Sequence, residues 1–451
     1  MESFEGWVER EYRRAAGAML KSISAVDLVK VRPGFGQTIR PRKGSIVASP
    51  VLASWDPDPD YFFHWYRDSA VVMDALRLLH ADGTVGSEAL THLRDFVSFS
   101  RSLRTLHGGE LVASPAWRAS VGESFTQYCR DDAELALIHG DSVLADTRVN
   151  PDGTLDITKW TRPQFDGPPL RALAVLRWAR SVPFDAELDA AALDLIGADL
   201  AFTLKHWREP SFDIWEEERA RHYYTLAVSA AALSEGAEWL ESRGDPAQAQ
   251  TCRAASAEIR SALDEFWLPD EGYYRSRLLP SGERSPKDLD IAVVLAAIHA
   301  DSGGDRHSPR DPRMHATLER LAELFDAEYA INHNRPPERG PAMGRYAGDR
   351  YFSGGAYYFA TLGAAELCYR AAAGFSAAAG GPPAMNRDTA REWFTKGEAY
   401  LATVRAFTPA SGELSEQFDQ RTGAQTSAKQ LAWSYAAFIS CLTARRAAAG
   451  V

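Results

Sequence analysis

The sequence predicts an all-α protein whose helices form an (α/α)6 barrel, two concentric rings of six helices each. Helical periodicity recurs in about twelve segments, and convincing strands are few. Successive helices alternate between amphipathic and almost wholly apolar. A helix without a polar face must be buried on most sides, so this alternation fits an inner and an outer ring. Two stacked helical domains are the alternative, but no linker-like segment lies near the middle of the chain.

Capping chemistry supports several of the expected helix boundaries. Gly244-Asp245-Pro246 ends one helix with glycine and starts the next with an N-cap and a proline. Ser285-Pro286 and Asp311-Pro312 repeat the cap-plus-proline start. The expected helices are 5–25, 67–82, 87–106, 168–182, 186–207, 217–243, 246–266, 286–301, 312–328, 353–373, 387–406 and 427–447.

The loops show a second alternation. Those after odd-numbered helices are mostly long and rich in Trp, Tyr, Arg, Asp and Glu, and the others are mostly short. Residues 374–386 are the exception and are expected to form a flexible surface connection. In an antiparallel barrel all odd-to-even loops emerge at one end, so we expect the functional site at that rim. These loops are 26–66, 107–167, 208–216, 267–285, 329–352 and 407–426.

Composition excludes several classes of partner. The 451 residues are 45% hydrophobic and 25% charged, as is ordinary for a globular protein. The net charge of -11 is spread along the chain, which argues against nucleic acids and anionic membranes. The four cysteines form no metal-binding cluster, so we expect no metal and no cofactor. The first residues lack a secretory apolar region, which favours a cytoplasmic location.

An Arg-Asp pair beside aromatic residues is the first candidate binding element. In DYFFHWYRDSA, residues 60–70, Arg67 and Asp68 follow Tyr61 and Trp65. Aromatic faces stack on sugar C–H groups, and a charged pair binds adjacent hydroxyls through charge-assisted hydrogen bonds. A structural ion pair in which Asp68 caps the helix is an equally open interpretation.

Two glutamates are candidates for acid–base chemistry. Glu216 follows Trp215 in SFDIWEEERARHYYT, and an indole neighbour would leave its carboxyl poorly solvated and protonated. Acidic residues at a helix start are also common because they favour the helix dipole. Glu416 in SGELSEQFDQ could be a solvated loop residue. In the barrel, however, both lie at one rim, and a pair of facing carboxylates is what glycoside hydrolysis requires.

Two further segments bring polar and aromatic side chains to the same rim. GRYAGDRYFSGGAYY contributes Arg345, Tyr346, Asp349 and Tyr357, and KWTRPQFDGPPLRA contributes Trp160, Arg162 and Asp166. No phosphate-binding, dinucleotide-binding, HExxH or GxSxG motif occurs in a suitable context. The combination favours a carbohydrate ligand.

These segments together resemble the glucoamylase family, glycoside hydrolase family fifteen, across almost the whole chain. The resemblance implies an (α/α)6 barrel and inverting release of glucose from the non-reducing ends of α-glucans. The matching blocks are ASPVLASWDPDPDYFFHWYRDSA, RPQFDGPPLRALAVL, FDIWEEERARHYYTLAVSAAALSEG, GRYAGDRYFSGGAYYFATLGAAE and LSEQFDQRTGAQTSAKQLAWSYAA.

The resemblance also implies residue roles. Glu216 would be the general acid and Glu416 the general base, with Tyr61 beneath the sugar ring. Trp160 would reach over the scissile bond, with Glu217 towards the next sugar. The other implied substrate-binding residues are Trp65, Arg67, Asp68, Trp215, Arg345, Tyr346, Tyr357, Gln417 and Trp433.

Several positions depart from the family pattern. Glu218-Arg219-Ala220-Arg221 replaces a small polar stretch and is expected to border the leaving group. Tyr357 stands where tryptophan is usual, and Ser353 where asparagine is usual. The linkage therefore stays open: trehalose, isomalto-oligosaccharides or a glucosylated metabolite are alternatives, as is a non-catalytic oligosaccharide-binding protein. A helical barrel of unrelated chemistry is the remaining alternative.

The resemblance also bears on organisation. Residues 1–451 are expected to form one catalytic domain, without the β-sandwich or starch-binding domain of many relatives. Short soluble oligosaccharides are the expected substrates, and a monomer is the expected state.

Overall fold

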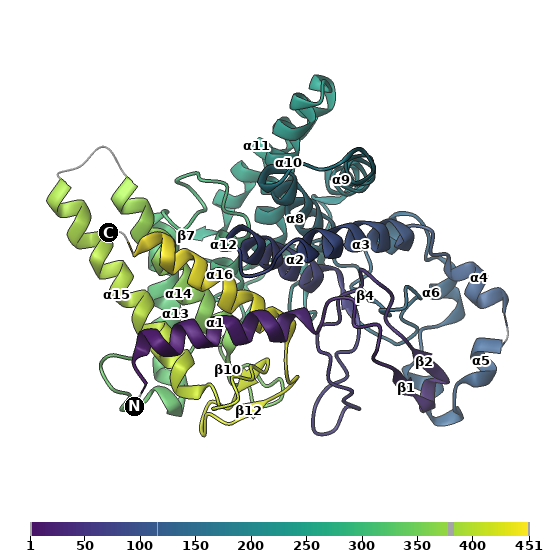
Figure 1. Cartoon of the computed structure of the whole chain (residues 1–451), viewed down its shortest axis with the longest axis horizontal. Helices are drawn as coiled ribbons and strands as arrows, with labels where there is room; N and C mark the ends of the chain where they lie inside the picture. Colours follow the sequence, from purple (N-terminus) through teal and green to yellow (C-terminus); the bar gives the residue numbers. More distant parts are fainter. Residues whose placement is uncertain (1, 115, 378–382, 450–451) are drawn as a thin grey trace.

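Six mostly buried helices form a closed inner ring. The computed structural model describes residues 2–114, 116–377 and 383–449, apart from the side chains of 376–386. The inner helices are α2 (Tyr66–Ala81), α8 (Gly167–Ser181), α10 (Tyr223–Ser242), α12 (Ala292–His299), α14 (Tyr358–Ala377) and α16 (Ala432–Ala448). Each packs against the next in this order, and α16 packs against α2, so the ring closes (Figure 1).

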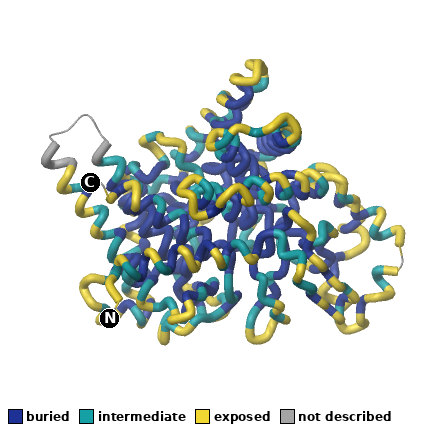
Figure 2. Tube along the Cα trace, viewed as in Figure 1, coloured by how far each residue is buried: buried dark blue, intermediate teal, exposed yellow. Residues whose placement is uncertain are grey.

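Six helices that expose one face to solvent surround this ring. They are α1 (Phe4–Leu20), α3 (Glu88–Leu103), α9 (Ala186–His206), α11 (Pro246–Leu263), α13 (Pro312–Glu328) and α15 (Pro383–Phe407). Helices α9, α11, α13 and α15 pack on α8, α10, α12 and α14, whereas α1 packs on α16 and α3 on α2 and α9. Buried residues concentrate in the middle of the molecule and exposed ones at its edge (Figure 2). The predicted (α/α)6 barrel is confirmed.

Helix starts agree with the sequence at two Asp-Pro caps and differ where a short strand or a turn takes the place of the expected first residues. Asp245 and Asp311 cap α11 and α13, each followed by its proline. The helix predicted from 217 begins at Tyr223, because residues 219–222 pair as a strand instead. The helix predicted from Pro286 begins at Ala292. The hydroxyl of Ser285 accepts the Lys287 N–H at 3.2 Å, but this turn does not continue as helix.

Short strands tie the loops together at one end of the barrel. They pair as β1–β2, β3–β4, β5–β6–β9, β7–β8 and β10–β11–β12. The strands are β1 (Lys30–Arg32), β2 (Gln37–Ile39), β3 (His64–Trp65), β4 (Arg148–Val149), β5 (Ser211–Phe212), β6 (Arg219–His222), β7 (Trp267–Leu268), β8 (Tyr273–Tyr274), β9 (Arg277–Leu278), β10 (Ala356–Tyr357), β11 (Gln417–Phe418) and β12 (Gln425–Thr426).

Short helices fill the long loop between α3 and α8. They are α4 (Gly108–Ala113), α5 (Ala116–Ser120), α6 (Asp132–Ala136) and α7 (Asp141–Leu144), and α4–α6 lie beside the barrel next to β1 and β2 (Figure 1). The connection predicted at 374–386 is shorter than expected, since α14 runs to Ala377 and α15 starts at Pro383. Residues 378–382 lie outside the described part. Among the described helices, none combines the length and apolarity needed to cross a membrane.

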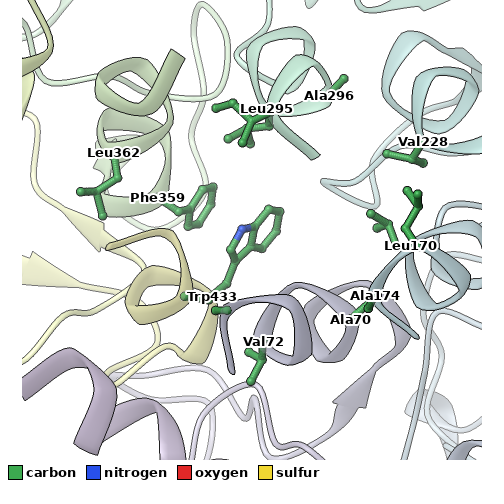
Figure 3. Close-up of a cluster of buried hydrophobic side chains, with 14 of the residues drawn as sticks. Ala70, Val72, Leu170, Ala174, Val228, Leu295, Ala296, Phe359, Leu362 and Trp433 are labelled. Atoms are coloured by element: carbon green, nitrogen blue, oxygen red, sulfur yellow. The ribbon is translucent and has the colours of Figure 1, made fainter. Parts of the chain in front are cut away.

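Two stacked rings divide the barrel lumen. The rings of Phe359 and Trp433 lie nearly parallel, with centroids 4.5 Å apart, amid aliphatic side chains such as Leu170 and Leu295 (Figure 3). Both rings line a cavity at the loop end of the barrel and a second, largely apolar cavity on the other side. The loop-end cavity is therefore closed at its inner end.

Candidate active site

A cavity of about 230 Å³ opens at the rim formed by the odd-to-even loops. It gathers most of the predicted site residues from loops that are far apart in sequence. Ile214, Tyr351, Phe359 and Leu431 also line it. The predicted residues in its wall are Tyr61, Trp65, Arg67, Asp68, Trp160, Trp215, Glu216, Glu217, Arg345, Glu416 and Trp433.

Glu216 lies in the tight turn that joins β5 to β6, not at a helix start. Its backbone is left-handed, with φ of 65°, a conformation that is costly for a residue with a side chain. The turn is held by Asp213, whose carboxylate accepts the N–H groups of Glu217 and Glu218 at 2.8 and 2.9 Å. The helix-dipole interpretation of Glu216 therefore does not apply, and the strained turn aims its carboxyl group into the cavity.

Three donors surround the Glu216 carboxyl group. Trp65 Nε1 donates to Oε1 at 2.8 Å, Arg67 Nη2 donates to Oε1 at 3.1 Å, and Trp160 Nε1 donates to Oε2. The expected indole neighbour, Trp215, instead donates its N–H to Asp290 at 2.9 Å. Glu216 is thus oriented by two indoles and a guanidinium.

Glu416 lines the same cavity, just before β11. Strand pairing of Gln417 with Thr426 brings Ser427 opposite it, and the Ser427 hydroxyl donates to Glu416 Oε2. The Tyr61 hydroxyl lies 3.4 Å from both carboxylate oxygens. Burial raises the pKa of Glu416 to about 7, while the Ser427 hydrogen bond acts against this increase. Ser427 was not predicted; the Thr422-Gly423 pair between the two residues is the sequence feature that could have indicated the β11–β12 hairpin.

Arg67 and Asp68 both lie in the first turn of α2, but their side chains have different neighbours. Arg67 donates to Asp166 at 3.1 Å as well as to Glu216. Asp68 does not cap the helix, since Trp65 occupies the N-cap position. Burial raises the pKa of Asp68 to about 6. Its carboxylate lies 3.6 Å from Arg67 Nε and lines the cavity, so it can accept a hydrogen bond from a ligand hydroxyl.

A second cluster of charged residues, centred on Arg345 and Glu217, also lines the cavity. Arg345 donates to Asp349 at 2.5 and 2.6 Å and to Glu217 at 3.0 Å. Glu217 also accepts from the Tyr346 hydroxyl and pairs with Lys287 Nζ at 2.6 Å. Tyr346 therefore contacts Glu217, which lines the cavity, but is not itself among the described lining residues. Lys287 was not predicted from the sequence.

Tyr357 and Gln417 lie behind this cluster. The Tyr357 hydroxyl donates to Asp349 at 3.2 Å and accepts from Gln417 Nε2 at 2.7 Å. Ser353 donates to Gln417 Oε1 at 3.0 Å. These side chains are not among the described lining residues of the cavity. They fix the position of Asp349, and Asp349 in turn fixes the position of Arg345.

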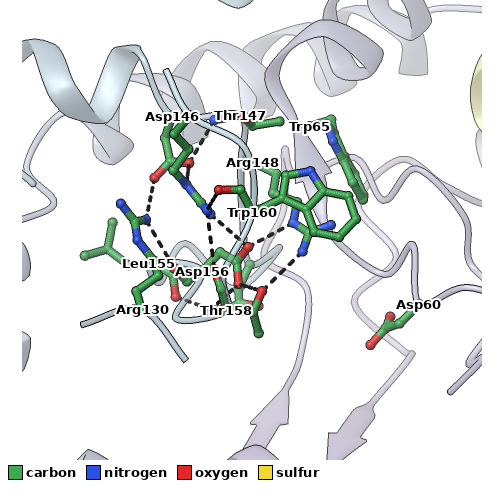
Figure 4. A network of polar contacts seen from close by, with 12 residues as sticks. Asp60, Trp65, Arg130, Asp146, Thr147, Arg148, Leu155, Asp156, Thr158 and Trp160 are labelled. Atoms are coloured by element: carbon green, nitrogen blue, oxygen red, sulfur yellow. Dashed lines mark hydrogen bonds and ion pairs between the residues drawn. The ribbon is translucent and has the colours of Figure 1, made fainter. Parts of the chain in front are cut away.

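An arginine that the sequence analysis missed supports Trp160. The Arg148 guanidinium lies 3.7 Å from the Trp160 ring centre and 4.7 Å from that of Trp65. It is fully buried and donates to Asp156 at 2.9 Å within a polar network (Figure 4). Asp156 also accepts from Arg162 at 3.0 Å. Arg162 is thus part of this network and is not among the described lining residues of the cavity. Stacking on a cation fixes one face of Trp160.

The residues that depart from the family pattern do not border the cavity in the described structure. Arg219 and Arg221 belong to β6, which pairs with β5 and β9. Glu218 accepts from Arg277 at 3.0 Å and from Ser285 at 2.8 Å. The expectation that this stretch borders the leaving group stays a prediction.

The arrangement is that of a polar, aromatic-walled pocket with two carboxyl groups from different loops. Within the described residues, no group of three or more His, Cys, Asp or Glu side chains is placed to hold a metal ion. Such a pocket at the rim of an (α/α)6 barrel is suited to acid–base hydrolysis of a glycosidic bond. The class defined by fold and site is a glycoside hydrolase.

Comparisons with known proteins agree. The family model for glycosyl hydrolases family 15 matches residues 140–443. A probable glucoamylase of Schizosaccharomyces pombe is 28% identical, over 99% of this chain and 93% of the relative. The intracellular sporulation-specific glucoamylase of Saccharomyces cerevisiae is 27% identical, over 88% of this chain and 77% of the relative. The structure of Hormoconis resinae glucoamylase, 26% identical, superposes with a TM-score of 0.76 over 98% of this chain and 74% of that one. The chain belongs to glycosyl hydrolases family 15.

Proposed function

We propose that this protein is an exo-acting α-glucosidase that releases β-glucose from α-gluco-oligosaccharides by inversion. The observation that carries the proposal is that Glu216 and Glu416 enter one closed-ended cavity from different loops. Because Phe359 and Trp433 close the inner end, the pocket suits the end of a chain rather than its middle. The resemblance to glucoamylases along nearly the whole chain supports the α-glucan substrate.

In this mechanism Glu216 donates its proton to the glycosidic oxygen as the bond from C1 to that oxygen breaks. Glu416 accepts a proton from a water molecule whose oxygen forms the new bond to C1 from the opposite face. Trp65, Arg67 and Trp160 orient the Glu216 carboxyl group through their hydrogen bonds.

The terminal glucose is bound by the remaining polar groups of the pocket. Asp68 accepts hydrogen bonds from sugar hydroxyls, and Arg67 and Arg345 donate to them. Trp215 and Trp433 provide apolar walls, and Tyr61 lies near Glu416 at the reacting carbon. Tyr346, Tyr357 and Gln417 contribute indirectly, by holding Glu217 and the Arg345–Asp349 pair in place.

Two matched substitutions test these assignments. Glu216→Gln and Glu416→Gln keep side-chain size and remove acid–base capacity, so each is expected to lower kcat by at least about 100-fold. Glu413→Gln, in the same loop as Glu416 but outside the cavity lining as described, is the control. Near-normal turnover by either active-site variant would remove that residue from its role.

The substrate itself is tested by chromatography after incubation with maltotriose, isomaltose and trehalose. Glucose from maltotriose, with maltose as the other early product, supports the proposal. Cleavage of trehalose or isomaltose alone would replace the α-1,4 assignment, and binding without turnover would indicate a non-catalytic oligosaccharide-binding protein.

We also propose that residues 1–451 act as one catalytic domain, as a monomer in the cytoplasm. The intracellular location of the Saccharomyces cerevisiae relative supports the last point. Size-exclusion chromatography with light scattering and cell fractionation test these assignments.

A further inference from the structure

Three indoles form a ladder from the wall of the cavity to its mouth. Trp65 is buried, Trp160 is half-buried, and Trp55 is 49% exposed. The ring centres of Trp65 and Trp160 lie 6.4 Å apart, and those of Trp160 and Trp55 lie 6.3 Å apart. Isolated exposed hydrophobic residues are common on protein surfaces, but Trp55 is not isolated, since it continues a row of rings that begins beside Glu216.

Trp55 is held in this position by an unusual and braced loop. Its backbone is left-handed, with φ of 78°, which is unfavourable for a bulky residue. The Lys30 ammonium donates to the Ala53 carbonyl oxygen. The Asp58 carboxylate pairs with Lys429 at 2.9 Å, which links this loop to the loop that carries Glu416. An indole that is both exposed and fixed contributes little to a core and is well suited to stack against a ligand.

The direction of the leaving group follows from the closed end of the cavity. Phe359 and Trp433 block the inner end, so the part of the substrate beyond the scissile bond must extend towards the mouth. Glu216 Oε1 already accepts from Trp65 and Arg67, so the proton for the leaving oxygen is assigned to Oε2, which lies beside Trp160. The first leaving sugar therefore meets Trp160, and a second one extends beyond it to Trp55.

We propose that Trp55 is a specificity-determining residue that stacks against the second sugar of the leaving group. The ligand class is a hexose ring within an α-gluco-oligosaccharide of three or more units. This inference rests on the proposed function. In this inference Trp55, which is outside the described cavity lining, gives the enzyme a preference for substrates with longer leaving groups.

The test compares maltose, whose leaving group is one glucose, with maltotriose, whose leaving group is two. Loss of one aromatic contact in Trp55→Ala should lower the ratio of kcat/KM for maltotriose to kcat/KM for maltose by roughly five- to tenfold. Trp55→Phe retains an aromatic face and should keep the ratio within about twofold of the unmodified protein. Leu193→Ala, which removes an exposed apolar side chain from α9, should leave the ratio unchanged.

The outcomes separate this inference from the proposed function. Absence of turnover of both sugars by the unmodified protein would overturn the proposed function and the inference with it. Normal turnover by the unmodified protein, with an unchanged ratio in Trp55→Ala, would overturn the inference alone. An equal loss on both substrates would also overturn it, because Trp55 would then act through Trp160 rather than on a second sugar.

Discussion

Replacing Ser427 by alanine removes the hydroxyl that donates to Oε2 of Glu416. This hydrogen bond favours the charged carboxylate and so lowers the pKa of Glu416, against the larger opposing effect of burial. Without this hydrogen bond the effect of burial is opposed less, so the pKa of Glu416 rises. The general base must be unprotonated, so activity on the acid side should be lost at a higher pH than in the unmodified protein.

The size of the shift follows from the type of bond. A hydrogen bond to a charged group contributes about 1.5 kcal/mol or more, and one pKa unit corresponds to about 1.4 kcal/mol. The acid limb should therefore move upward by roughly one unit from its starting position near the raised pKa of Glu416, about 7. At a pH above both of these Glu416 pKa values but low enough for Glu216 to keep its proton, the variant should be nearly as active as the unmodified protein, since Glu416 is then ionised in both.

The assay is the pH profile of kcat/KM for maltose, which reports ionisations of the free enzyme. Ser434→Ala is the matched control, because its hydroxyl donates to the Ser415 carbonyl oxygen at 2.8 Å rather than to Glu416. An acid limb that stays in place or moves to lower pH in Ser427→Ala would refute the reasoning. A uniform loss at every pH would also refute it, since that would indicate a general distortion of the loop.

Two further substitutions test other parts of the structure. Trp160→Phe removes the indole N–H that orients Glu216, and should lower kcat/KM for maltose by about tenfold or more, measured by glucose release. An unchanged kcat/KM would contradict this orienting role. Arg171→Ala leaves Asp199 buried without its partner, and should reduce the free energy of unfolding in urea by about 3–5 kcal/mol. The exposed pair of Arg320 with Glu323 is the control, and a loss in Arg171→Ala no larger than in Arg320→Ala would contradict the prediction.

The barrel was predictable because its helices have a periodic burial pattern. The alternation of amphipathic and apolar segments gave the two rings, and the Asp-Pro signals at Asp245 and Asp311 gave two helix starts. The start expected at residue 217 was wrong, because the four-residue strand β6 is too short to produce a pattern. The start expected at residue 286 was wrong, because the turn that begins at Ser285 does not continue as helix.

The candidate site was predicted in its composition but not in its contacts. Sequence blocks pointed to Glu216 and Glu416, but not to the left-handed turn that holds the former. Arg148 could not be found from its neighbours in sequence, because its role depends on rings contributed by β3 and by the loop before α8. Trp55 was likewise passed over, since its proximity to Trp160 exists only in the folded chain.

The central claim is inversion by a pair of carboxyl groups acting on opposite faces of the sugar. Proton NMR of freshly added maltose, recorded before the anomers interconvert, tests it most directly. The account predicts that the β-anomer of glucose appears first and then equilibrates. Initial release of the α-anomer would contradict the account, because it would require retention and a covalent intermediate.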